Sequence, residues 1–246
     1  MTEQPSFKER VDELRFYIKV LNEFYTLIIL HKTKSNNKSP YGEYFQNVID
    51  KCGKKQDSST FLVILKSNAL MMMYNLVEAT VKQQIAKIYT SINNDQLDFK
   101  QLSSYYKELF KKYTFKGNDG HELSNNKKII DASSNLISDI LENRSLEFKI
   151  KKFKLSGNAD LRQIKVIFKE HDIELNESVS KYGSELLNIK NSRNGLAHGS
   201  DTFSNNADNL TAQEISNYAE DVVAFLKYLI SETNKFIKSK SYKLSS

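Results

Sequence analysis

Apolar residues recur every three or four positions along most of the chain, the spacing of amphipathic helices. In the first such segment they include Val11, Leu14, Ile18 and Leu21. A later segment is apolar on nearly all sides from Phe61 onward, which predicts a helix at the centre of the fold or in an interface. We predict helices over residues 6–31, 61–89, 95–113, 126–142, 160–171, 176–193 and 211–240.

Three polar patterns mark expected helix starts and loops. Ser6 with Glu9, and Thr211 with Glu214, have the spacing of a capping box. We interpret Asn158 and Asp160 as residues that fix a loop before the next helix.

Two segments lack helical spacing. Residues 32–58 are rich in Lys, Asn and Ser, and we predict a long loop there with a short helix around residues 41–49. Residues 146–155 alternate basic and apolar side chains, which favours an extended segment.

The pattern therefore predicts an all-α fold: a single domain over residues 1–246, with a helical insertion at about residues 93–172. Composition agrees, because 2 Pro and 8 Gly in 246 residues are too few for the many turns of an all-β domain. One Cys excludes an internal disulfide framework and a zinc site made of several cysteines.

No uninterrupted apolar run approaches the roughly 18 residues that span a bilayer. With no signal peptide visible either, we expect a cytoplasmic protein without a membrane span.

The net charge of +6 is compatible with a polyanionic partner such as RNA. Two stretches concentrate this charge. The first mixes cations with Phe148 and Phe153, so it could follow an RNA backbone and stack on bases; its candidate RNA-binding residues are Lys149, Lys151, Lys152 and Lys154. The second is C-terminal: Lys235, Lys238, Lys240 and Lys243. The alternative for both is an ordinary solvated face.

Only one of the four histidines has a context that suggests chemistry. Three histidines have ordinary structural interpretations: His31 at a helix end, His121 in a turn and His171 near the end of a basic helix. His198 instead follows Arg193 and Asn194 near a predicted helix end. Such a pair suits RNA cleavage, because the ribose supplies its own 2′-hydroxyl nucleophile and neither a metal nor a cofactor is required. Histidine can move the proton, while arginine holds the phosphate as negative charge builds on it.

A structural alternative remains for the same residues, with Arg193 in a surface ion pair and His198 capping a helix end. Geometry adds a condition to the catalytic interpretation. Five residues on a straight helix turn by about 500°, so the two side chains would point about 140° apart. Either the helix breaks near Gly195, or two chains pair so that their motifs meet.

Four segments in the same order resemble the MAE-type branch of the HEPN superfamily, a group of helical domains that includes many metal-independent endoribonucleases. Arg193–His198 fits the superfamily's Arg-polar-x-x-x-His motif. Phe7–Tyr17 resembles the opening helix of these proteins, and Met72–Val81 resembles their second long helix. Leu155–Ile164 resembles their Ser-Gly-Asn-x-Asp segment.

The resemblance implies a helical bundle that forms a homodimer, in which the two Arg–His motifs meet and cleave RNA to leave a cyclic phosphate. It makes Arg193 and His198 catalytic, with Asn194 as their polar companion. Asn75 and Glu78 match polar positions of the second helix, where they would support the catalytic pair or make a polar contact between helices.

The implied setting is a toxin–antitoxin or antiphage defence system with an antitoxin protein as partner. Some HEPN toxins carry a Tyr two residues after the motif His, which a nucleotidyltransferase antitoxin modifies. Here that position is Ser200, which argues against an antitoxin of that kind.

Two other classes of function stay open. A helical module that binds RNA, a nucleotide or a protein without cutting is the main alternative, since a fold alone does not fix a function. A metal-dependent hydrolase is disfavoured, because the chain lacks His-Glu-x-x-His and any clustered histidines.

Overall fold

The computed structural model describes residues 5–33, 43–44, 47–48, 51, 58–117, 119–155 and 157–244. Most of the predicted loop at 32–58, with its short helix around 41–49, lies outside the described residues. Within the described part the chain is all-α, as predicted, and its β-structure is limited to two isolated bridges, Leu102 with Lys243 and Lys116 with Glu122.

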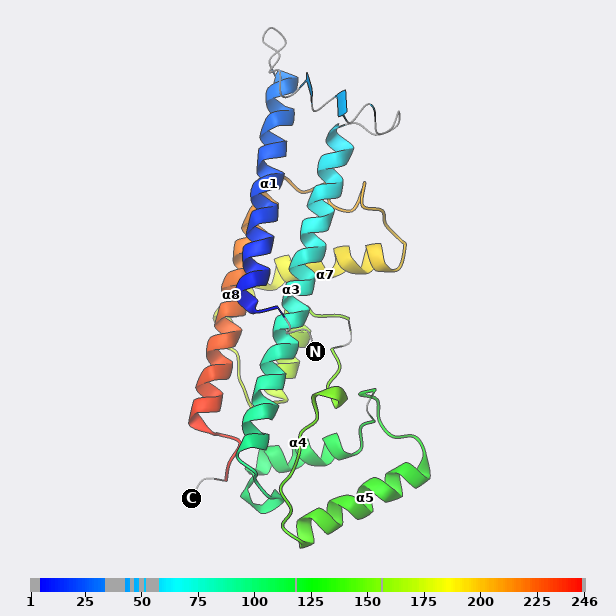
Figure 1. Cartoon of the computed structure of the whole chain (residues 1–246), viewed down its shortest axis with the longest axis vertical. Helices are drawn as coiled ribbons and strands as arrows, with labels where there is room; N and C mark the ends of the chain where they lie inside the picture. The colour runs from blue at the N-terminus through cyan, green and yellow to red at the C-terminus, as the bar shows by residue number, and fades with distance from the viewer. Residues whose placement is uncertain are drawn as a thin grey trace. The chain divides into compact units, whose positions relative to one another are not determined.

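The helices follow the predicted order (Figure 1). The α-helices are α1 (Phe7–Thr33), α3 (Ser58–Asn94), α4 (Ser104–Thr114), α5 (Asn126–Leu141), α6 (Leu161–Lys169), α7 (Gly183–Ala197) and α8 (Ala212–Ser239). Short 3-10 turns are η1 (Phe99–Gln101), η2 (Ile150–Lys152) and η3 (Glu177–Tyr182).

The chain divides into two compact units. The first comprises Met1–Val77 and Tyr182–Phe225, and the second comprises Glu78–Lys181 and Leu226–Ser246. Helices α3 and α8 each supply one half to each unit. The single domain with an insertion at 93–172 stays a prediction.

The first unit joins α1 to the neighbouring halves of α3 and α8 through polar contacts around an apolar core. Arg15 of α1 forms a bidentate ion pair with Glu220 of α8, with nitrogen–oxygen distances of 3.0 and 2.7 Å. The Tyr17 hydroxyl donates to the Leu65 carbonyl of α3 at 3.0 Å. The inward positions of α1 are buried as its spacing predicts: Val11, Leu14, Ile18, Leu21 and Ile28.

The second unit is built around aromatic rings, which compensate for the absence of Trp. The fully buried ring of Phe148 lies 5.2 Å from that of Tyr89 and 5.2 Å from that of Phe110, between ring centroids. Tyr106 and Tyr113 also contact it, at 6.2 and 5.7 Å. Offset and edge-on pairs of this kind add to the stability that burial alone provides.

The C-terminal residues of this unit are held by Asp95, which directly follows α3. Its carboxylate pairs with Lys240 at 2.8 Å and Lys243 at 3.1 Å, and accepts a hydrogen bond from the Tyr242 hydroxyl. The bond from Lys240 is the main reason that the pKa of Asp95 falls to about 2. Two cations of the predicted C-terminal basic stretch are therefore engaged in this structural pairing.

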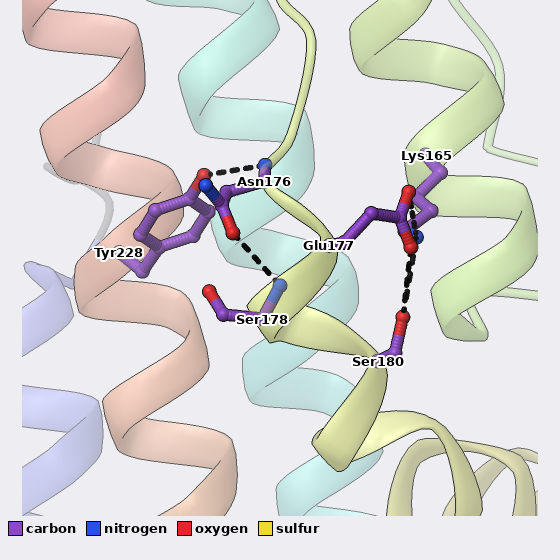
Figure 2. A network of polar contacts seen from close by, with 6 residues as sticks. All are labelled: Lys165, Asn176, Glu177, Ser178, Ser180 and Tyr228. Carbon is purple, nitrogen blue, oxygen red and sulfur yellow. Dashed lines mark hydrogen bonds and ion pairs between the residues drawn. The ribbon is translucent and has the colours of Figure 1, made fainter.

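A polar network fixes η3, the turn that precedes α7 in the chain (Figure 2). The Asn176 side chain accepts a hydrogen bond from the Ser178 backbone at 2.8 Å, while the Asn176 backbone donates to the Tyr228 hydroxyl at 2.9 Å. On the other side of the turn, Glu177 pairs with Lys165 at 3.2 Å. The predicted helix over 176–193 is thus divided into the 3-10 turn η3 and α7, which begins at Gly183.

Two further predictions of local structure were wrong. The helix over 95–113 is interrupted, because Leu102 is extended and bridges to Lys243, and α4 begins only after Ser103 caps it. The segment 146–155 forms no strand, since η2 occupies its middle. Both capping boxes are confirmed, and Asp160 is confirmed as the cap of α6 through its bond from the Gln163 backbone at 2.9 Å.

Among the described helices, α3 is the one that is long and apolar enough to cross a membrane by length and composition. Its most apolar window reaches a mean hydropathy of 1.4, and 56% of that window is buried. A buried core helix meets the same criteria.

Candidate functional site

The Arg–His motif lies in the last turn of α7, within the first unit. The Arg193 guanidinium carbon is 5.1 Å from the centroid of the Tyr74 ring, which is fully buried on α3. The same guanidinium donates to the Asn194 side-chain oxygen at 3.2 Å. The ring quadrupole attracts a cation over its face, so Tyr74 helps to position the Arg193 guanidinium at the end of α7.

His198 ends α7 as its C-terminal cap. Its backbone N–H donates to the Asn194 carbonyl at 3.0 Å, and its side chain is exposed. No hydrogen bond to another described residue holds the imidazole. It is thus accessible to a ligand from solvent.

The reversal of the chain directly after His198 depends on Gly199. Gly199 has φ +71°, in the left-handed region that terminates many helices. A side chain at this position would meet no atom within 4 Å, so the requirement for glycine is one of backbone conformation alone.

We therefore expect Gly199→Ala to lower the free energy of unfolding by about 1 kcal/mol, since alanine is strained in this conformation. Gly199→Asn should cost less, because asparagine tolerates left-handed backbone. Urea unfolding of the three proteins measures both effects. Equal stability of the alanine variant and the wild type would contradict this account.

α7 continues through Gly195 as far as Ala197, so the alternative of a helix break near Gly195 does not apply. Space at this position is tight: a Cβ there would lie 3.2 Å from the Asp201 side chain, which packs over the helix. Because the helix is unbroken, Arg193 and His198 of one chain diverge by about 140°. The pairing of two chains stays a prediction.

The segment that follows His198 is anchored to both neighbouring helices. Asn206 donates to the Ser192 carbonyl of α7 at 3.2 Å and to the Asp201 carboxylate at 2.8 Å. On α3, Lys66 is only 9% exposed and donates to the Leu210 carbonyl at 2.5 Å, and burial lowers its pKa. Ser67, also on α3, donates to the Phe203 carbonyl at 2.9 Å. The loop is therefore a fixed part of the site.

Sequence reasoning missed Tyr74 and Lys66. Tyr74 is directly beside Asn75 on α3, yet nothing in its local pattern distinguishes it from other core aromatics. A lysine within the apolar stretch of 61–73 was the one available signal that Lys66 has a polar partner.

The two polar residues predicted to support the pair lie in different units. Asn75 is exposed on α3, and its side chain forms no hydrogen bond within the described part of the chain. Glu78 is partly exposed and belongs to the second unit. The proposed support of the catalytic pair by these residues stays a prediction.

The four candidate RNA-binding lysines, all in the second unit, differ in their surroundings. Lys152 is turned inward: its ammonium donates to the Tyr113 carbonyl at 3.1 Å, and burial lowers its pKa. Lys149 pairs with Glu147 at 3.3 Å, and Lys151 and Lys154 are exposed. Stacking of a base on Phe148 is excluded, because only 2% of this residue is exposed.

No group of three or more His, Cys, Asp or Glu side chains in the described residues is placed to hold a metal ion. The site consists of a guanidinium, an amide, an imidazole and the backbone around them. This set can bind an anion and transfer a proton.

A helical bundle with this motif at the end of a helix defines the class of HEPN domains. The family model described as MAE_28990-like HEPN matches residues 6–242, nearly the whole chain. The chain therefore belongs to the MAE-type HEPN family. Comparison with curated proteins and with solved structures gives no significant match.

Proposed function

We propose that the protein is a metal-independent endoribonuclease that acts as a homodimer. The observation that carries the proposal is the arrangement at the end of α7, where the Arg193 guanidinium lies over the Tyr74 ring and His198 is exposed to solvent. Membership of the HEPN family supports the same reading, since many HEPN domains cleave RNA.

In the proposed reaction, the 2′-hydroxyl of one nucleotide attacks the phosphorus of its own 3′-phosphodiester. His198 takes the proton of that hydroxyl or returns one to the departing 5′-oxygen. Arg193 stabilises the negative charge on the phosphorus-centred transition state, and Asn194 orients the guanidinium. The products are a 2′,3′-cyclic phosphate and a 5′-hydroxyl.

The divergence of the two side chains on α7 leads to a composite site. In a twofold dimer, Arg193 of one chain would act with His198 of its partner. In the cell, we place the protein in a toxin–antitoxin or antiphage defence system, where an antitoxin protein would restrain it.

Cleavage of a mixed-sequence RNA in the presence of EDTA tests the proposal. We expect cleavage by the wild type and a loss of about 10²–10⁴-fold in rate for both His198→Ala and Arg193→Ala. His121→Ala, which removes an exposed histidine of the second unit, is the control and should retain full activity. Equal activity of all four proteins would refute the site, and RNA binding without cleavage would support the non-catalytic module.

A further inference from the structure

A cavity of about 290 Å³ lies between α7 and the segment that follows it. Leu70 and Leu210 supply its apolar surface, and its other lining residues are polar: Asn188, Asn191, Ser192, Asp201, Asn206 and Asn209. The volume is at the lower end of the range for small-molecule sites, so it suits one flat ring system. Four amides line this cavity, and a side-chain amide that is not already engaged offers both donors and an acceptor.

The inner wall of this cavity is rigid, while its rim is free to bind. The Asn206 amide donates to the Ser192 carbonyl and to the Asp201 carboxylate, and its oxygen accepts from the Ser192 hydroxyl. Asn191 and Asn209 are exposed, and their side chains make no hydrogen bond to other described residues. These two amides are available to a ligand without breaking a contact.

Asp201 gives the cavity a preference among ligands. Each of its oxygens already accepts one hydrogen bond, from the Thr202 backbone at 2.8 Å and from Asn206 at 2.8 Å. Each oxygen keeps a second lone pair, and an ionised carboxylate can only accept. The wall therefore favours a ligand that presents an amino group and disfavours one that presents a carbonyl oxygen.

The position of the cavity along α7 connects it to His198. Asn191 and His198 are seven residues apart. On an α-helix this separation corresponds to a rotation 20° short of two full turns and to a rise of about 10 Å. They therefore share a face, whereas Arg193 points away from it toward Tyr74. A base held at Asn191 would place the phosphodiester of its own nucleotide toward His198 of the same chain.

We infer that this amide-lined cavity is the base-binding subsite for a single-stranded RNA, selective for bases with an exocyclic amino group over uracil. The inference rests on the proposed ribonuclease function and extends it to substrate preference. Asparagine amides pair with the edge of adenine, and carboxylates accept from the amino group of cytosine. Unpaired bases of single strands are the ones that a protein cavity can receive.

Equilibrium binding of uncleavable RNA to the full chain tests the inference. The probes are fluorescent pentamers of 2′-O-methyl adenylate, cytidylate and uridylate, with the three corresponding nucleoside monophosphates alongside. We expect the adenylate or the cytidylate pentamer to bind at least fivefold more tightly than the uridylate pentamer. The pentamers should also bind more tightly than the monophosphates, because neighbouring phosphates add contacts.

The variant Asn191→Ala/Asn209→Ala should weaken binding of the preferred pentamer by roughly tenfold and remove the preference over uridylate. Asn205→Ala is the matched control, since it removes an exposed amide of the same segment that does not line the cavity. Equal affinities for all three pentamers, or a double variant that binds like the wild type, would overturn the inference. Monophosphates that bind as tightly as pentamers would assign the cavity to a free nucleotide and overturn it as well.

Failure of the inference can be told apart from failure of the proposed function. The probes cannot be cleaved, so their binding does not depend on catalysis. A protein that binds the pentamers as expected but cuts no RNA would refute the nuclease alone. A nuclease that cuts without base preference would refute the subsite alone.

Discussion

A mixture of two inactive variants, His198→Ala and Arg193→Ala, is expected to recover about a quarter of the wild-type cleavage rate. Each dimer has two composite sites in the proposed arrangement. A mixed dimer retains one complete site, with Arg193 from the first variant and His198 from the second. Random exchange makes half of the dimers mixed, so one site in four is complete. The unbroken helix α7 is the structural reason, because it separates the two side chains of one chain.

The control for this experiment keeps the same proportions and removes the possibility of a complete site. The His198→Ala variant is mixed with the double variant Arg193→Ala/His198→Ala, and this mixture should stay inactive. Recovery is measured as cleavage of labelled RNA after the dimers have exchanged. If the first mixture stays as inactive as the control while mixed dimers are present, the composite site is refuted.

The largest change in the free energy of unfolding is expected on acidification, through the buried side chain of His171. The imidazole is 2% exposed and lies between the Tyr89 hydroxyl, 2.9 Å from Nε2, and the Ile167 carbonyl, 2.7 Å from Nδ1. A carbonyl can only accept, so Nδ1 carries the hydrogen and Nε2 accepts from Tyr89 in the neutral ring. Burial lowers the pKa of His171 to about 4, against the opposing effect of the Ile167 carbonyl.

The sign of the pH dependence follows from this depressed pKa. Between pH 6.5 and about 4 the unfolded chain binds a proton at this residue and the folded protein does not, so acid favours unfolding. The stabilisation by His171 is complete above pH 6.5. This stabilisation falls by about 1 kcal/mol at pH 5.5 and by about 3 kcal/mol once the pH is below 4.

Urea unfolding at pH 7.5, 5.5 and 4.5 measures this loss. His171→Asn should be less stable than the wild type at pH 7.5 and should lose less stability on acidification. His121→Asn, which changes an exposed histidine, should follow the wild-type curve. A His171→Asn curve parallel to that of the wild type would contradict the assignment.

The sequence predicted those parts of the fold that depend on neighbouring residues. The capping boxes of Ser6 with Glu9 and Thr211 with Glu214 mark the starts of α1 and α8, because both partners lie within one turn. The break before α4 could not be predicted, since it depends on Leu102 meeting Lys243, far along the chain. The motif itself was visible from the residue types of Arg193 and His198.

The surroundings of the motif were not visible in the sequence, for a similar reason. Arg193 of α7 lies over the ring of Tyr74 on α3, so this contact joins two helices that are distant in sequence. Likewise, Lys66 of α3 donates a hydrogen bond to Leu210, which lies in the loop before α8. The burial of His171 also depends on a distant partner, Tyr89. An isolated histidine after a basic helix gives no sign of such a partner.

The continuity of α7 through Gly195 has a consequence for how the proposed enzyme would behave in a cell. A single copy carries both chemical groups but presents them in different directions, so in the proposed dimer mechanism a newly made chain would be inactive until it met a second copy. At low concentrations, the rate of RNA cleavage in the cell would then rise with the square of the concentration of the chain. A modest change in synthesis or degradation would therefore act as a threshold.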